Sequence, residues 1–166
     1  AEAMPTDWAA RGEGSTALAV AVRSRAPIQV IQQLLNANLH QIGVTHTVRG
    51  SVLHEALKHR AKDFVLDCLV RAAMEYDQQT SNHKSACLLG HIDELGRTAL
   101  HYMLDRIVRS LDRGERSPAS WNVVRMLVRA HPASVSTIDA DGDTPLVLLL
   151  LIPRFSMNAG GAELEE

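Results

Sequence analysis

Aromatic residues and cysteines are both scarce in this chain of 166 residues. Phe, Trp and Tyr together make up only 4% of the sequence, so its interior must be built from Leu, Val, Ile and Ala. Such a composition favours packed helices over a β-sandwich, whose strands are enriched in aromatic residues. The two cysteines, Cys68 and Cys87, allow at most one disulfide, which excludes a disulfide framework. Cys68 lies on the apolar side of a helical pattern, where we expect a small buried residue rather than a reactive thiol.

The chain also lacks an excess of charge of one sign and a long apolar run. Its formal net charge is -2, and its basic residues form no stripe interleaved with aromatics, which argues against nucleic acid as a partner. The longest apolar run, residues 146–152, is far shorter than the roughly 20 residues that cross a bilayer. Residues 1–16 lack the basic start and apolar core of a secretory signal. We therefore expect an intracellular protein without a transmembrane segment, in the cytosol or in an organelle interior.

Motifs of catalysis and cofactor binding are absent as well. The sequence contains no Gly-x-Gly-x-x-Gly, no Walker loop, no Gly-x-Ser-x-Gly and no His-Glu-x-x-His. His83, Cys87 and His91 are spaced four residues apart, so a continuous helix would place three zinc ligands on one face. Gly90 disfavours that helix, and no Cys-x-x-Cys pair completes the site. We expect no catalytic residue, no cofactor and no metal site, and we keep zinc at these three residues as an alternative.

Three aspartates, Asp139, Asp141 and Asp143, alternate in the stretch DADGDTPLVLLLL at residues 139–151. A calcium loop of the EF-hand type needs Gly at its sixth position and Glu at its twelfth. Here Gly142 is fourth and Leu150 is twelfth, so the spacing excludes an EF-hand.

The same stretch fits a turn that leads into a helix. Aspartate side chains bond their own backbone in turns, and Gly142 can adopt a positive φ angle. Thr144 can cap the amides of a following helix, and Pro145 suits the first helical position. We therefore predict a hairpin turn, an N-cap and a helix at this point.

This turn and helix pattern recurs along the chain. The related octets are GSTALAVA (14–21), RGSVLHEA (49–56), GRTALHYM (96–103) and GDTPLVLL (142–149). Their aligned leucines, Leu18, Leu53, Leu100 and Leu146, are 35, 47 and 46 residues apart. A second helical pattern, with apolar residues three and four positions apart, follows at 27–37, 62–73 and 120–130. Each unit is therefore turn, helix, short link and helix, and it must stack on a neighbour to bury its apolar face.

These residues resemble the ankyrin repeat, whose signature is a Gly-x-Thr-Pro-Leu-His-x-Ala turn and helix. GRTALH (96–101) and GDTPL (142–146) match it well, and residues 122–146 resemble an ankyrin second helix running through its hairpin into the next repeat. The resemblance covers roughly residues 12–152 and is strongest at 96–149. Elsewhere it is degenerate, because Ala19 and Val147 replace the signature histidine and the second unit has Arg49 and Ser51 in place of Gly and Thr.

The resemblance implies an all-α, ankyrin-like helical solenoid of about four helix-turn-helix units. The units lie near residues 12–45, 46–92, 93–138 and 139–152, between an N-terminal arm at 1–11 and a C-terminal tail at 153–166. It implies that the signature histidine bonds the turn, so that His101 would bond Thr98 or its backbone. The structural turn residues that it implies are Gly14, Thr16, His54, Gly96, Thr98, His101, Gly142, Thr144 and Pro145.

Two insertions, residues 74–92 and 113–120, depart from the family's period. We expect the first to lengthen the connection between units two and three, and the second to separate the helices of unit three. Insertions in solenoids map to loops and often carry specificity, but tolerated surface drift would look the same.

The resemblance also implies a function, the binding of a protein partner on the concave face of the solenoid. Carried over by position, the turn contacts are Glu13, Ser15, Val48, Gly50, Leu95, Arg97, Asp141 and Asp143. The contacts at the ends of the first helices are Arg23, Ser24, Lys58, His59, Asp105 and Arg106. These helix-end contacts are mostly basic and would suit an acidic or polar segment of a partner, although a solvated face without function would also be charged.

The apolar run at 146–152 supports an alternative function. A solenoid normally ends in a polar cap, so an apolar last helix is expected to be covered. It could be the end of a fragment of a longer repeat protein, it could pack against unit three, or it could be the buried contact of an accessory subunit built permanently into a larger complex.

Overall fold

The computed structural model describes residues 15–46, 49–80, 87–113 and 118–150, and these residues are mostly helical with almost no strand. The expected all-α class is therefore confirmed. The α-helices are α1 (Ala17–Arg23), α2 (Ile28–Ala37), α3 (Val52–Lys58), α4 (Asp63–Thr80), α5 (Ala99–Asp112), α6 (Pro118–Ala130) and α7 (Pro145–Leu150). Glu13, Gly14, Val48 and His83 lie outside the described residues, as do the expected arm at 1–11, the tail at 153–166 and residues 151 and 152 of the apolar run.

Short elements connect these helices. The two-residue strands β1 (Thr45–His46) and β2 (Gly50–Ser51) pair antiparallel, with Thr45 opposite Ser51. Three 3₁₀ helices, η1 (Leu39–Gly43), η2 (Leu88–Gly90) and η3 (Pro132–Ser136), follow the second helix of a pair or precede the next turn.

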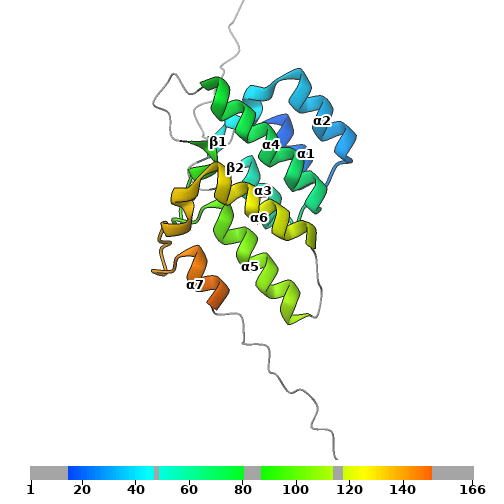
Figure 1. The fold of residues 1–166 in the computed structure, drawn as a ribbon. Coiled ribbons are helices and arrows are strands. Elements are labelled where there is room, and N and C mark those ends of the chain that lie inside the picture. The colour runs from blue at the N-terminus through cyan, green and yellow to red at the C-terminus, as the bar shows by residue number, and fades with distance from the viewer. Residues whose placement is uncertain (1–14, 47–48, 81–86, 114–117, 151–166) are drawn as a thin grey trace, which may run out of the picture.

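The helices form two rows. α1, α3, α5 and α7 contact one another in that order, and α2, α4 and α6 form a second row in the same way. The two rows are joined within each pair, α1 with α2, α3 with α4 and α5 with α6. Figure 1 shows this progression from the blue pair α1 and α2 to the orange α7. Each helix pair thus buries its apolar side against the next pair.

The helices of the first row begin at the recurring octets. Thr16 accepts a hydrogen bond from the Ala19 amide, and Ser51 and Thr98 form capping boxes with His54 and His101. Such caps satisfy amides that have no partner inside the helix. The repeated leucine follows each cap, and in α1, α3 and α5 it is buried in the core, as Leu18, Leu53 and Leu100 are.

Side chains from both rows form one core. Its largest fully buried members come from α1, α2, η1, α4, α5 and α6 and are Leu18, Ile31, Ile42, Leu66, Leu69, Met103 and Leu127. Cys68, which we expected to be buried, packs against this core but is only partly buried. Among the described residues, no helix is long and apolar enough to span a membrane.

The two insertions differ from the expected connecting loops. α4 continues to Thr80, so residues 74–80 of the first insertion are helical. This stretch contains good helix formers such as Glu75, Gln78 and Gln79, and Tyr76 packs against the core. In the second insertion, residues 118–120 already belong to α6, because proline is favoured in the first turn of a helix.

Candidate protein-interaction surface

Two turns of the same construction precede α5 and α7. In the first, residues 93–97, the Asp93 amide donates to the Arg97 carbonyl (3.1 Å) and the Gly96 amide donates to the Asp93 carbonyl (3.0 Å). The Asp93 carboxylate accepts from the amides of Leu95 (3.0 Å) and Arg97 (3.1 Å). The Asp93 side chain therefore stabilises the conformation of its own turn.

Residues 139–143 repeat this arrangement. The Asp139 amide donates to the Asp143 carbonyl (2.9 Å), and the Asp139 carboxylate accepts from the amides of Asp141 and Asp143 (3.0 Å each). Val147 donates its amide to the Thr144 hydroxyl (3.4 Å), and α7 begins at Pro145. The hairpin turn, N-cap and helix predicted for this stretch are thus present, and the Asp139 carboxylate binds backbone amides.

The two turns allow a matched test of backbone strain. Gly96 and Gly142 both have positive φ angles, 69° and 88°, which side chains other than glycine adopt at a cost of about 1 kcal/mol. A Cβ at Gly96 would also lie 3.3 Å from the Asp139 Cα, whereas nothing lies within 4 Å of one at Gly142. We expect Gly142→Ala to lower the free energy of unfolding by about 1 kcal/mol and Gly96→Ala to lower it more. Urea unfolding of both variants checks this, and equal losses would contradict the contact between the two turns.

Two buried histidines, one on α3 and one on α5, connect their helix to the next turn. His54 Nδ1 accepts from the Ser51 amide (3.1 Å), and its Nε2 donates to the Arg97 carbonyl (3.0 Å), which is 43 residues away. His101 has the expected bond to Thr98, from its amide to Nδ1 (3.1 Å), and its Nε2 donates to the Asp143 carbonyl (3.4 Å). Each imidazole therefore closes its own cap and also bonds the following unit.

These bonds require neutral histidines. Because Nδ1 accepts a hydrogen bond, a second proton on the ring would face an amide donor. Burial lowers the pKa of His54 to about 4, and burial also lowers the pKa of His101. Both rings are therefore structural links, not groups ready to exchange protons near neutral pH.

Asp93 also connects the first row of helices. Its side chain is 0% exposed and accepts hydrogen bonds from the Tyr102 hydroxyl (2.6 Å) and from Lys58 Nζ (3.0 Å). The Lys58 ammonium lies 5.1 Å from the centre of the Tyr102 ring. Burial alone would raise the pKa of Asp93, but the hydrogen bonds from Tyr102, Lys58 and the Arg97 amide outweigh it and hold that pKa below its usual value. Asp93 thus links α3 to α5 as a buried carboxylate.

Three of the basic residues expected to meet a partner also bind neighbouring parts of the same chain. Lys58 pairs with Asp93, and Arg97 pairs with Asp139 (3.0 Å) and Asp141 (2.7 Å). Arg106 pairs with Asp63 (2.9 Å) and also donates to the Ala61 carbonyl. Each of these three basic side chains therefore has a carboxylate partner within the chain.

Among the other described contact residues, Gly50 is buried and the rest are exposed or partly exposed. Arg23 and His59 approach the same carboxylate, Glu55, at 3.9 Å and 3.6 Å. The Ser24 hydroxyl donates to the Val20 carbonyl within α1. Asp105 pairs with Arg109 (2.9 Å) across one turn of α5.

The structure brings Lys58, Asp105 and Arg106 together in one hollow. This open hollow of about 670 Å³ lies between α3 and α5 and is also lined by Tyr102, Arg60, Arg109 and Arg113. We refer to it as the α3–α5 hollow. A smaller hollow of about 130 Å³ lies beside the β1–β2 hairpin, and Arg23, Ser15 and Glu55 contribute to its lining. Of the predicted contacts at the helix ends, Lys58, Asp105 and Arg106 thus line one hollow and Arg23 lines the other, whereas Ser24 and His59 line neither.

The zinc alternative requires an α-helix that includes residues 87–91, and these residues do not form one. Residues 88–90 are a 3₁₀ turn, and Cys87 Sγ donates to the Asp77 carboxylate (3.0 Å). Burial and this carboxylate raise the pKa of Cys87, which disfavours the thiolate that zinc needs. Within the described ranges, no three His, Cys, Asp or Glu side chains are grouped so that they could hold a metal ion.

Sequence reasoning missed Asp93 and Tyr102. A signal for Asp93 was present, because Asp-x-x-Gly-x-Thr occurs at both 93–98 and 139–144. Tyr102 gave no comparable signal, since its importance arises from contact with residues distant in the chain. Comparison of the chain with protein-family models, with curated proteins and with solved structures finds no match.

Proposed function

We propose that the protein is a non-catalytic protein-binding module, built as a short ankyrin-like solenoid of about four units. Two features support the proposed architecture. The first helices of the pairs lie in one row, and the second helices lie in another. The histidine at the signature position bonds the next turn in two successive units. Stacked repeats of this kind present an extended surface to a partner.

The observation that carries the proposed function is the α3–α5 hollow. Its lining includes Lys58, Tyr102 and Arg106. Lys58 and Tyr102 donate hydrogen bonds to the Asp93 carboxylate, and Arg106 pairs with the Asp63 carboxylate, so the positions of all three side chains are fixed. A surface that is fixed before association loses less conformational freedom on binding. Five basic side chains and one acidic side chain, that of Asp105, line the hollow. An acidic segment of a protein partner fits this charge.

The titratable groups near the hollow suit binding better than proton transfer. Burial and the neighbouring Asp93 carboxylate raise the pKa of Tyr102, the reverse of what a tyrosine base needs. Asp93 is ionised and already accepts four hydrogen bonds. These groups fix the shape of the hollow.

One observation supports the second candidate, an accessory subunit of a larger complex. Leu146 and Leu150 on α7 are 54% and 74% exposed, although α7 packs on α5. Two exposed leucines on the last described helix could be covered by another subunit.

Affinity purification from native extract tests the proposed function. Arg109→Glu reverses a charge in the hollow without touching the Asp93 or Asp63 pairs, and Arg71→Glu is its control because Arg71 forms an equivalent exposed pair with Asp67 on α4. We expect a stoichiometric partner whose capture falls about tenfold with Arg109→Glu and not with Arg71→Glu. A partner retained by Arg109→Glu and lost when Leu146 and Leu150 are changed to serine would support the accessory subunit instead.

A further inference from the structure

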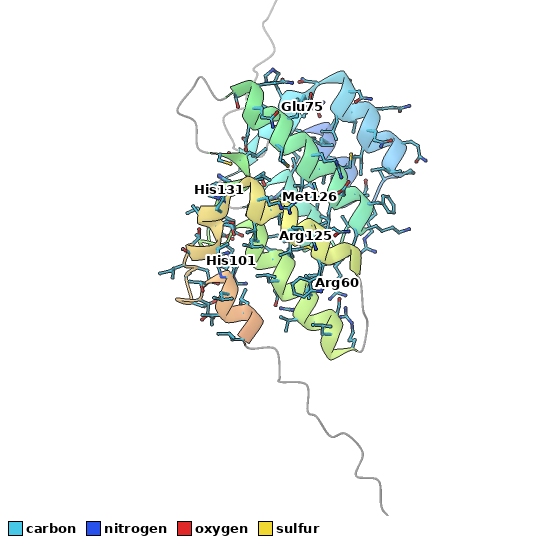
Figure 2. All side chains as sticks on the ribbon, in the orientation of Figure 1. Arg60, Glu75, His101, Arg125, Met126 and His131 are labelled. Carbon is cyan, nitrogen blue, oxygen red and sulfur yellow. The ribbon has the colours of Figure 1, made fainter. Side chains whose placement is uncertain are left out.

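A second cleft lies where the links inside two successive helix pairs meet. Its volume is about 190 Å³, and it lies between the link from α1 to α2 and the link from α3 to α4. The apolar lining residues are Val22, Ala26, Pro27, Ile28, Ile31, Ala61, Phe64 and Val65. Arg60, which is labelled in Figure 2, is also part of the lining. We refer to this site as the link cleft.

The rim of the link cleft is basic. Arg25, Arg60 and Lys62 line it, and its lining contains no acidic residue. Phe64 is 53% exposed, and the Lys62 ammonium lies 5.8 Å from the centre of its ring. The Phe64 ring is thus partly exposed to solvent, and it lies beside the apolar residues of the cleft and close to the positive charge of Lys62.

Arg25 and Arg60 have backbone conformations that are rare for arginine. Their φ angles are 55° and 54°, and each occupies the left-handed position that ends a helix. In both places the next amide bonds back to the helix, from Ala26 to Ala21 (2.9 Å) and from Ala61 to Ala56 (2.8 Å). Glycine is the favoured residue at this position because it has no Cβ. An arginine therefore stands in place of the favoured glycine on both sides of the link cleft, and both arginines line its rim.

We propose that the link cleft binds an acidic peptide segment of a partner protein, with one bulky apolar side chain between Asp or Glu residues. The apolar side chain enters the cleft beside Phe64, and the flanking carboxylates meet Arg25, Arg60 and Lys62. Arginine suits this role because its guanidinium binds carboxylates through two parallel hydrogen bonds. RNA would supply negative charge but no aliphatic group for the apolar wall.

This inference rests on the proposed function, since its ligand is a protein segment, but it uses a different surface. Arg60 lines both sites, whereas Arg25, Lys62 and Phe64 line only the link cleft and Arg109 lines only the α3–α5 hollow. Variants at Arg25 and Arg109 therefore separate the two sites.

The test is a fluorescence anisotropy titration with labelled pentapeptides of the form Glu-Glu-X-Glu-Glu, in which X is each of the twenty amino acids. We expect peptides with Leu, Ile, Met or Phe at X to bind at least tenfold more tightly than the peptide with Gly. Arg25→Gly should weaken their binding at least tenfold while raising the urea midpoint, because glycine relieves the left-handed backbone. Phe64→Ala should weaken it as well, and Arg109→Glu should leave it unchanged.

Three results would overturn the inference. They are no binding by any of the twenty peptides, equal binding whatever residue stands at X, and unchanged binding by Arg25→Gly. A twelve-nucleotide oligouridine that binds more tightly than every peptide would point to an RNA ligand instead. If the link cleft fails while partner capture still depends on Arg109, only this inference falls and the proposed function stands.

Discussion

Replacing Asp93 with alanine should lower the free energy of unfolding by about 3 kcal/mol, because it leaves several buried donors without an acceptor. The variant removes the acceptor of the Tyr102 hydroxyl, of Lys58 Nζ and of two turn amides at once. It also takes away the carboxylate that neutralises Lys58 between α3 and α5. Urea unfolding at pH 7.5, followed by far-UV circular dichroism, measures the loss.

Asp67→Ala is the matched control for this variant. Asp67 also pairs with a basic side chain, Arg71 (2.8 Å), but both side chains are exposed and lie on the same helix. Exposed ion pairs contribute little to stability, so we expect a far smaller loss than at Asp93. Equal effects of the two substitutions would show that Asp93 does not hold the first row of helices together.

Lowering the pH from 7.5 to 5 should destabilise the protein by about 2 kcal/mol through His54 alone. The unfolded state binds a proton on this side chain near its ordinary pKa of 6.5, whereas the folded state resists protonation down to about 4. Stability is therefore complete above pH 6.5 and is lost as the pH falls toward 4. His91 and His101 add to the loss in the same direction, because burial lowers the pKa of each.

Urea midpoints at pH 7.5, 6 and 5 test this dependence on wild type, His54→Gln and His40→Gln. We expect His54→Gln to be less stable than wild type at pH 7.5 but to lose less stability on acidification. His40 is exposed, so its replacement is a control for the loss of an imidazole outside the core. A wild-type stability that stays constant between pH 7.5 and 5 would show that the histidines are not locked in the neutral form.

The local parts of this structure could be predicted because their signals lie within a few residues. The Thr98 and His101 pair and the turn at 139–143 are set by side chains that bond their own or nearby backbone, so a few neighbouring residues contain all the information. The all-α class could be predicted in the same way, from periodic apolar residues without aromatics.

The contacts between units could not be predicted, because they depend on which surfaces stack. The bond from His101 Nε2 to the Asp143 carbonyl joins residues 42 positions apart, and no short pattern encodes it. The carboxylate partners of Lys58, Arg97 and Arg106 within the chain could not be predicted either, because exposed and paired basic side chains look alike in a sequence. The left-handed Arg25 and Arg60 carried no signal either, since glycine is the residue that indicates such a helix end.

Hydrogen exchange on the free protein and on its complex with the captured partner tests the proposed preformed binding surface most directly. We expect the amides of α3, α5 and the turns at 93–97 and 139–143 to exchange slowly already in the free protein, because buried carboxylates and histidines hold them. Binding should then add protection at the rim of the α3–α5 hollow, around Asp105 and Arg109. Fast exchange of the two turns in the free protein, or added protection only on α2, α4 and α6, would contradict a preformed binding surface on the first row of helices.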